Sequence, residues 1–189
     1  KAQKQYRQKV TDSKLLNYQK IFYFSPYKIF NANKTISYIR KGNANIYIDN
    51  IASATNYLKK SSSSSVVNQG IVNAIKKALA FEVRAANEDL IKLVAVQPKH
   101  SILHYNLALT YAQLGNMKKA HKHFLRSYYL DAKNYLSGVY AVMASQLIDE
   151  ENMKMKTILT DSINQEQPSE AIALYKTLLY IAEDNILSS

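Results

Sequence analysis

The chain has 189 residues, of which 47% are apolar, 21% are charged and none is cysteine. This composition is sufficient for a continuous core, and it excludes a wholly disordered protein, disulfide bonds and thiolate metal sites. A sheet of many strands needs many tight turns, which are rich in Gly and Pro. Because the chain has only four Gly and three Pro, we expect an all-α fold.

The net charge of +11 is unevenly distributed along the chain. Residues 1–140 carry 22 basic and 6 acidic side chains, whereas residues 141–189 carry 3 and 8. A basic surface attracts nucleic acid, anionic lipid or an acidic partner, and the sign of the charge does not choose among them. No stretch approaches the roughly 18 apolar residues of a membrane span. Because the chain begins with Lys, we expect it to be a piece of a longer protein.

Residues 1–60 are expected to form N-terminal helices that include a degenerate repeat. A helix is predicted over residues 2–24, with core contacts from Tyr6, Val10, Tyr18, Ile21 and Phe22. Apolar and polar side chains also alternate over residues 36–48, as they do in the strands of a β-hairpin, so a β-hairpin is the competing prediction there. The serine run over residues 61–65 is predicted to be a loop, because it has no apolar surface to bury.

Residues 66–189 contain helical hairpins that recur along the chain. In the clearest unit, over residues 101–134, two apolar stripes at helical spacing are separated by Gly115–Asn116. The apolar pair at positions 124/125 recurs at a spacing of 34 residues, because similar pairs occur at 90/91 and at 158/159. Burial of a large apolar side chain stabilises by roughly 1.5–3 kcal/mol, so these pairs are expected to supply much of the core.

The step predicts hairpins over 66–100, 101–134 and 135–167, followed by a final helix over 168–184. With the degenerate unit near the N-terminus, this makes about three to four repeats plus flanking helices. In the final helix, Ile172 and Ile181 are expected to face outward, which is not the polar outer face of a terminal capping helix. We therefore expect further repeats or a partner to cover this end.

The best unit resembles the tetratricopeptide repeat family in its Leu107-Ala108-x2-Tyr111, Gly115 and Ala120-x3-Phe124 positions. The resemblance implies an α-α superhelix of stacked hairpins whose first helices line a concave groove. The chain departs from the pattern at His104, where Trp is favoured, and at Lys154, where a small residue packs. The third hairpin is therefore expected to pack loosely.

The resemblance also assigns seven side chains to the groove as a partner-binding surface. They are Ile102, Tyr105, Asn106, Leu109, Gln113, Leu136 and Tyr140. An apolar and aromatic lining with few charges suits an extended peptide or a helix of another protein. Of the residues that form the family's clamp on a terminal carboxylate, only Asn106 has a counterpart here, so that clamp is excluded.

A basic patch is predicted on the second helix of the same hairpin, formed by Lys118, Lys119, Lys122 and Arg126. We expect an acidic protein surface to bind there. Because fifteen tyrosines are interleaved with the lysines of the chain, a basic helical module that binds single-stranded nucleic acid is the alternative.

The sequence contains no constellation that points to catalysis, a metal or a cofactor. The pairs His100/His104 and His121/His123 provide too few converging ligands for a metal, and the second pair is expected on an outer face. The acidic run 149–151 is expected to be a solvated turn. No Gly-rich phosphate loop or nucleophile elbow is present. We expect no enzyme activity, no cofactor, no metal and no small-molecule substrate.

The predicted function is a non-enzymatic scaffold for protein–protein interaction. The Lys-, Asn-, Ile-, Tyr- and Ser-rich composition also resembles the periplasmic tetratricopeptide proteins of bacterial flagellar motors, the paralysed-flagellum scaffolds. That resemblance implies flagellar motor components as partners and the periplasm as the location. A cytoplasmic location is the alternative. A chaperone, pilus-assembly factor or secretion factor of the same repeat class is the other prediction.

Overall fold

The computed structural model describes residues 51–60 and 66–187, which form helices only. The described helices are α4 (Ile51–Lys60), α5 (Val66–Leu79), α6 (Val83–Val96), α7 (Ser101–Gln113), α8 (Met117–Leu130), α9 (Tyr135–Leu147), α10 (Met153–Asn164) and α11 (Glu170–Leu187). The all-α class expected from the composition is confirmed for this part of the chain. The predicted helix over 2–24, the alternative hairpin over 36–48 and the serine loop over 61–65 lie outside the described residues.

Short turns between the helices produce three antiparallel hairpins. In each turn one residue has a positive φ, namely Phe81 (65°), Gly115 (82°) and Asp149 (55°). An Asn then begins the next helix in two of the hairpins, because Asn116 accepts from the backbone N–H of Lys119 and Asn152 from that of Met155. The left-handed residue and the polar cap together end one helix and start the next.

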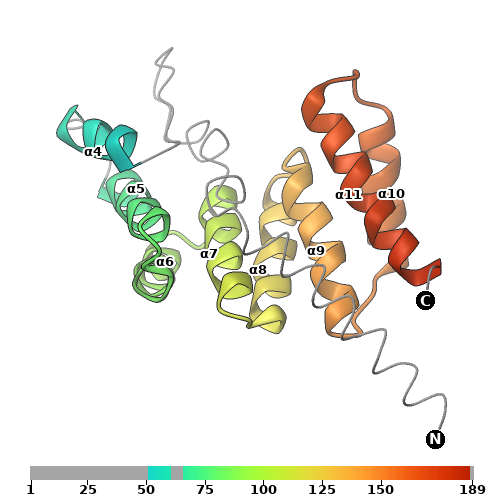
Figure 1. The fold of residues 1–189 in the computed structure, drawn as a ribbon, viewed down its shortest axis with the longest axis horizontal. Coiled ribbons are helices and arrows are strands. Elements are labelled where there is room, and N and C mark those ends of the chain that lie inside the picture. Colours follow the sequence, from blue (N-terminus) through green and yellow to red (C-terminus); the bar gives the residue numbers. More distant parts are fainter. Residues whose placement is uncertain (1–50, 61–65, 188–189) are drawn as a thin grey trace, which may run out of the picture.

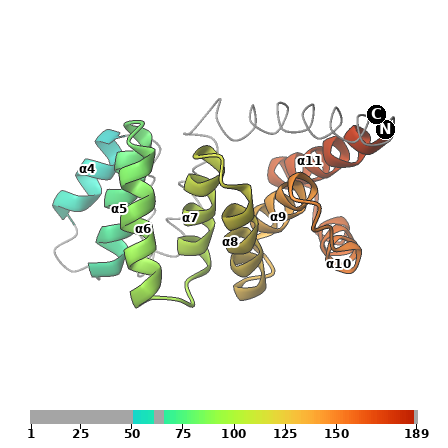
Figure 2. The ribbon, with the colours of Figure 1, turned by 90° about the horizontal axis from the view of Figure 1, so that it is seen from below.

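The hairpins stack in chain order to form a superhelix. Figure 1 shows the helices following one another across the molecule from α4 to α11, and Figure 2 shows α4 to α8 side by side from another direction. Consecutive helices pack against each other from α4 to α9, and α11 packs against α9. Because each hairpin buries one side against the next, a single apolar core runs along the stack.

The core takes one residue from each of the apolar pairs at positions 90/91, 124/125 and 158/159. Leu90, Phe124 and Leu159 are fully buried, whereas Ile91 is 42% exposed and Ile158 is 51% exposed. The pairs were expected to supply much of the core, and each of them does so mainly through one member. The repeat length also changes to 35 residues between Phe124 and Leu159.

In the third hairpin, the two helices α9 and α10 contact each other less extensively than the helices of the other two hairpins do. The expectation that Lys154 takes the packing position of Ala120 was wrong, because with a step of 35 residues that position holds Met155, which is buried, while Lys154 is exposed. The Met side chain is larger than that of Ala, so α10 cannot approach α9 there as closely as α8 approaches α7. Figure 2 shows α10 turned away from the row formed by the earlier helices.

None of the helices in the described part of the chain is long and apolar enough to cross a membrane.

Candidate functional site

The seven residues predicted to line the groove all lie on α7 and α9, and all of them are buried. Their exposed fractions range from 0% for Tyr105, Asn106 and Leu109 to 7% for Gln113. The burial extends to the whole of both helices, because every residue of α7 and all of α9 except Leu147 are buried. Binding of a partner by these side chains stays a prediction, and in this structure they are covered.

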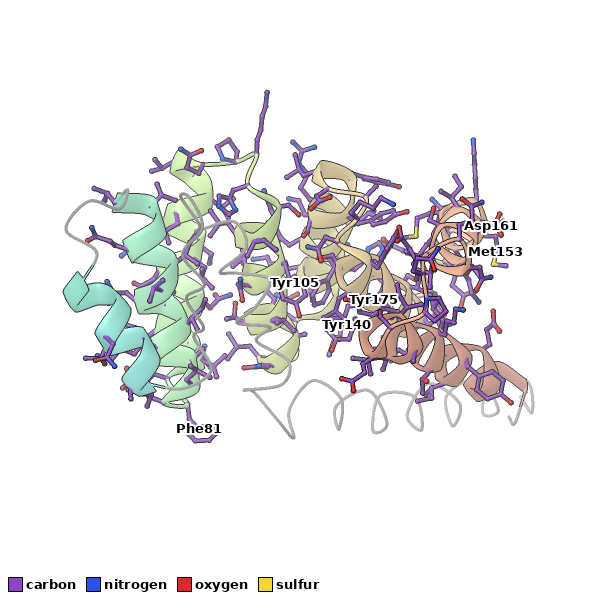
Figure 3. The ribbon with its side chains drawn as sticks, turned by 90° about the horizontal axis from the view of Figure 1, so that it is seen from above. Phe81, Tyr105, Tyr140, Met153, Asp161 and Tyr175 are labelled. Carbon is purple, nitrogen blue, oxygen red and sulfur yellow. The ribbon has the colours of Figure 1, made fainter. Side chains whose placement is uncertain are left out.

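Tyrosines recur every 35 residues on the first helices of successive hairpins. Tyr105 of α7, Tyr140 of α9 and Tyr175 of α11 are all at most 6% exposed, and Figure 3 shows them close together in the middle of the stack. The rings of Tyr105 and Tyr140 stack with 6.4 Å between centroids and 9° between planes. The ring of Phe124 from α8 meets that of Tyr140 edge-on at 5.4 Å. We call Tyr105, Tyr140 and Tyr175 the tyrosine row.

Burial governs the protonation of Tyr140 and Tyr175. It raises the pKa of Tyr140 strongly and that of Tyr175 in the same direction, because a phenolate would lose its hydration in this apolar setting. These side chains therefore stay neutral at physiological pH and contribute packing area and hydroxyl groups, not charge. The sequence signal for the row is the constant spacing of 35 residues between its members. This spacing is not noticed when each tyrosine is assigned separately to the core or to the surface.

The buried amide of Gln113 lies at the C-terminal end of α7. The residue is 7% exposed, and its Nε2 has no hydrogen-bond partner among the residues that the structure describes. A buried N–H group without an acceptor costs about 1–3 kcal/mol, so such groups are rare unless a ligand or another chain segment supplies a carbonyl.

The predicted basic patch lies on the outer side of α8. Lys118, Lys119, Lys122 and Arg126 are all exposed, and the Nζ of Lys119 lies 5.4 Å from the centre of the Tyr111 ring. Three of the four, Lys118, Lys122 and Arg126, are spaced by four residues and so follow one side of the helix.

Two histidines meet between α7 and α8. His123 is not on an outer face as expected, because its ring stacks on His104 and on Tyr111 with centroid distances of 5.3 and 5.7 Å. The Nε2 of His104 lies 2.7 Å from the carbonyl oxygen of Pro98 and therefore donates to it. Neutral His104 then accepts at Nδ1, so His123 donates its Nδ1–H across the 3.0 Å separation.

This arrangement favours neutral histidines. Burial, together with the smaller effects of His104, Lys122 and Lys119, lowers the pKa of His123 to about 4. The pKa of His104 is also lowered, first by burial, although its bond to the Pro98 carbonyl opposes the shift. His100 begins α7 by accepting the backbone N–H of Leu103 at Nδ1, so it has a structural role as well.

The described residues contain no group of three or more His, Asp or Glu side chains that could hold a metal ion. The acidic run 149–151 lies in the turn between α9 and α10, where Glu150 approaches His121 to 3.9 Å. A small cavity of about 110 Å³ adjoins this turn, with Leu125 and Met155 in its wall. The separation between Glu150 and His121 is too long for a hydrogen bond, so this pair is not poised for proton transfer.

A buried polar cluster that the sequence did not predict joins three helix ends. Ser101 and Ser127 donate their hydroxyl protons to each other's backbone carbonyls at 2.8 and 2.7 Å. Because the hydroxyl proton of Ser127 is used in this way, its Oγ accepts from Ser137 at 2.8 Å and from Asn134 at 3.1 Å. Serines are unremarkable in a sequence, and only their convergence in space identifies them as a unit.

The last two helices, α10 and α11, which we call the final hairpin, expose large apolar side chains. On α10 and α11 these are Met153 (62%), Ile158 (51%), Leu174 (51%), Tyr180 (66%) and Ile181 (37%). The outward position of Ile181 agrees with expectation, but Ile172 is buried, because it lies on the side of α11 that faces the core. We call these five residues the terminal apolar set.

Regular hairpins that share one core along a row define a helical-repeat protein, a class whose members present extended surfaces to other molecules. Residues 102–134, which form α7, α8 and the turns that flank them, match the family model of the tetratricopeptide repeat. The chain therefore carries a tetratricopeptide repeat, and the resemblance inferred from its motifs is confirmed there. No curated protein matches the chain.

Proposed function

We propose that this chain is a non-enzymatic scaffold that docks a partner protein on its final hairpin. The observation that carries the proposal is the terminal apolar set, because a solenoid that ends in water requires a polar outer face. Clusters of exposed apolar side chains on a folded surface mark sites of protein interaction more often than isolated ones do.

The chemistry of the partner follows from the surroundings of the terminal apolar set. Asp161, Glu170 and Glu183 are exposed on the same two helices. The chain from residue 141 onward carries 8 acidic and only 3 basic side chains. Lys154 and Lys176 are also exposed on these helices, and Lys156 pairs with Glu183, so an apolar surface with a rim of mixed charge complements this hairpin best.

The test compares two double variants of the full chain. Leu174→Lys with Ile181→Lys places charge in the terminal apolar set, and Ile91→Lys with Val96→Lys makes the same kind of change at exposed positions of α6. Partners captured from the native host are quantified by mass spectrometry, and circular dichroism checks that both variants keep their helicity.

We expect the first variant to lose a specific partner that the second variant retains. Equal capture by the two variants, with unchanged helicity, would exclude the final hairpin as the docking surface.

Nucleic acid binding is the second candidate, and one observation favours it. All four members of the basic patch are exposed on α8 and free of ion pairs shorter than 4.0 Å to described acidic residues. If they neutralised four phosphates of a single strand, log K would fall against log salt with a slope of about −3. A salt titration with single-stranded DNA or RNA therefore separates the candidates, since docking on apolar side chains has a shallow salt dependence.

A periplasmic role in a flagellar motor, or a role as a chaperone, pilus-assembly factor or secretion factor, stays a narrower prediction within the scaffold proposal. Its support is composition and the repeat class alone. Co-purification of the full-length protein with motor components, or with pilus or secretion components, would separate these roles.

A further inference from the structure

Helix α11 exposes one side that is buried on the other first helices of the stack. Leu174, Thr177 and Ile181 are spaced by three and four residues, so they lie on one side of the helix, which we call the α11 strip. Leu174 is 51% exposed, Ile181 is 37% exposed and Thr177 is exposed as well. The Thr177 hydroxyl donates to the carbonyl oxygen of Ala173 at 2.8 Å. Its polar group is therefore satisfied within the helix, and the strip is apolar in character.

The positions of the α11 strip are covered in the two preceding hairpins. With the 35-residue spacing of the tyrosine row, they correspond on α7 to His104, Leu107 and Tyr111, which are at most 9% exposed. On α8, the His123 ring stacks on two of these three side chains. On α9 the same positions are at most 6% exposed and are held by Val139, Val142 and Gln146.

The cover in the inner hairpins is the second helix of the same hairpin. On α7 it is α8, through the ring of His123, and on α9 Val142 and Gln146 share the wall of one cavity with Met155 of α10. The α11 strip continues this row of interfaces at the end of the stack (Figure 1), but no described helix covers it.

The second helix α8 indicates which chemistry fits such a strip. It spans 14 residues, and the small Ala120 and the large Phe124, four residues apart, are both fully buried. The small residue lets the two helices approach, and the large one fills the space between them. The exposed Ala171 and Ala173 beside the α11 strip leave room for an equally close approach.

The charge next to the α11 strip indicates the direction of the docked helix. Glu170 is exposed at the N-terminal end of the strip, four residues before Leu174. Lys176 and Glu183 are two and nine residues from Leu174, which places them on the opposite side of the helix. A helix that runs antiparallel to α11, as α8 does to α7, brings its last turn to Glu170. A basic residue in that turn complements both Glu170 and the C-terminal end of the docked helix.

We propose that α11 is the first helix of a fourth hairpin, whose second helix is an amphipathic helix of a partner protein. That helix carries a small and a large apolar residue four positions apart and a basic residue near its C-terminal end. The proposal rests on the proposed docking function and adds the kind of partner segment and its orientation.

The first experiment attaches a helix of this pattern to the full chain. A second copy of residues 117–130 is joined to the C-terminus by a flexible Gly/Ser linker, which gives a roughly millimolar effective concentration. This copy contains Ala120 and Phe124, with Arg126 in its C-terminal half. The matched control has Phe124→Glu in the attached copy only, and circular dichroism checks the helicity of both proteins.

The measurement is the rate of maleimide labelling at a single thiol, since the chain has no Cys. Thr177→Cys places the thiol in the α11 strip, and Lys176→Cys places it on the opposite side of α11. The attached copy is expected to slow labelling of the Thr177→Cys variant several-fold and to leave the Lys176→Cys variant unchanged. Equal labelling of the Thr177→Cys variant with the attached copy and with its control would overturn the proposal.

The second experiment identifies what covers the α11 strip in the native host. Ile181 is replaced by photoreactive p-benzoylphenylalanine in the full chain, and cross-linked peptides are sequenced by mass spectrometry. Cross-links to a helical segment of another protein with the stated pattern support the proposal. Cross-links to an extended segment, to a second copy or within the same chain overturn it, as does the absence of cross-links.

Failure of this proposal is distinguishable from failure of the proposed function. If Leu174→Lys with Ile181→Lys loses a partner but the cross-linked segment is extended, docking on the final hairpin stands and the helix proposal fails. If that double variant retains every partner, the docking function fails and the helix proposal fails with it.

Discussion

At the level of single residues, the hydroxyl group of Ser127 joins the ends of three helices. It donates to the carbonyl of Ser101 at the start of α7 and accepts from Ser137 in α9 and from Asn134 just before α9. The site is fully buried, so no water replaces these hydrogen bonds when one of them is removed.

Replacing Ser127 with Ala is therefore expected to lower the free energy of unfolding by about 1–3 kcal/mol, since a buried acceptor shared by two donors is lost. Urea unfolding followed by circular dichroism measures the change. Ser162→Ala is the control, because the Ser162 hydroxyl bonds only to the carbonyl of Ile158 on its own exposed helix. A loss of the same size in both variants would mean that the buried hydrogen bonds of Ser127 stabilise the fold no more than the single hydrogen bond of Ser162 does.

The pair His104–His123 makes stability depend on pH. The pKa of His123 is lowered from 6.5 to about 4 in the folded chain, mainly by burial, so protons bind more strongly to the unfolded chain. The facing groups are His104 and Tyr111 from α7 and Lys119 and Lys122 from α8 itself. The stability that neutral His123 supports is fully present above pH 6.5 and is lost as the pH falls toward 4.

His123→Gln is expected to reduce this loss, because the Gln amide can still donate to the Nδ1 of His104 but does not ionise. Urea unfolding at pH 7 and at pH 5 gives, for each protein, the difference in the free energy of unfolding between the two pH values. The same difference in the variant and the wild type would show that His123 is not the titrating group.

At the level of helices, Gly138 sets how closely α9 meets its neighbours. A Cβ at this position would lie 2.8 Å from Cδ1 of Leu159 on α10 and 3.0 Å from Cδ2 of Tyr128 on α8. The missing side chain thus lets helices on both sides approach the same turn of α9.

Gly138→Val is expected to lower the free energy of unfolding by about 1–3 kcal/mol through overpacking. Gly138→Ala should lose less, because the better helix propensity of Ala returns up to about 1 kcal/mol. Thermal unfolding of both variants tests the order. An unchanged midpoint for Gly138→Val would show that Leu159 and Tyr128 can move aside without cost.

At the level of the whole molecule, the stack is held together by contacts between neighbours. The inner helices α7, α8 and α9 have packed helices on both sides, whereas α4 and α11 end the described row. Stability in such an array is a sum over units and their interfaces, so the terminal units open most easily.

Hydrogen exchange followed by mass spectrometry is therefore expected to show the slowest amides in α7 to α9 and faster exchange in α4 and α11. Exchange of all helices at one common rate would indicate a single cooperative unit instead of a linear array.

The sequence by itself determined the helical class, the hairpin at residues 101–134 and the basic patch of α8, because these follow from local periodicity and from caps and turns such as Gly115–Asn116. It did not determine which member of each apolar pair is buried, because the 34-residue step of the sequence pattern becomes 35 residues between Phe124 and Leu159, which exposes Ile158. Nor did it indicate that the groove side chains are covered, or that Ser101, Ser127 and Ser137 meet. Burial and buried hydrogen bonds depend on which segments distant in sequence come together, and only the tertiary structure decides that.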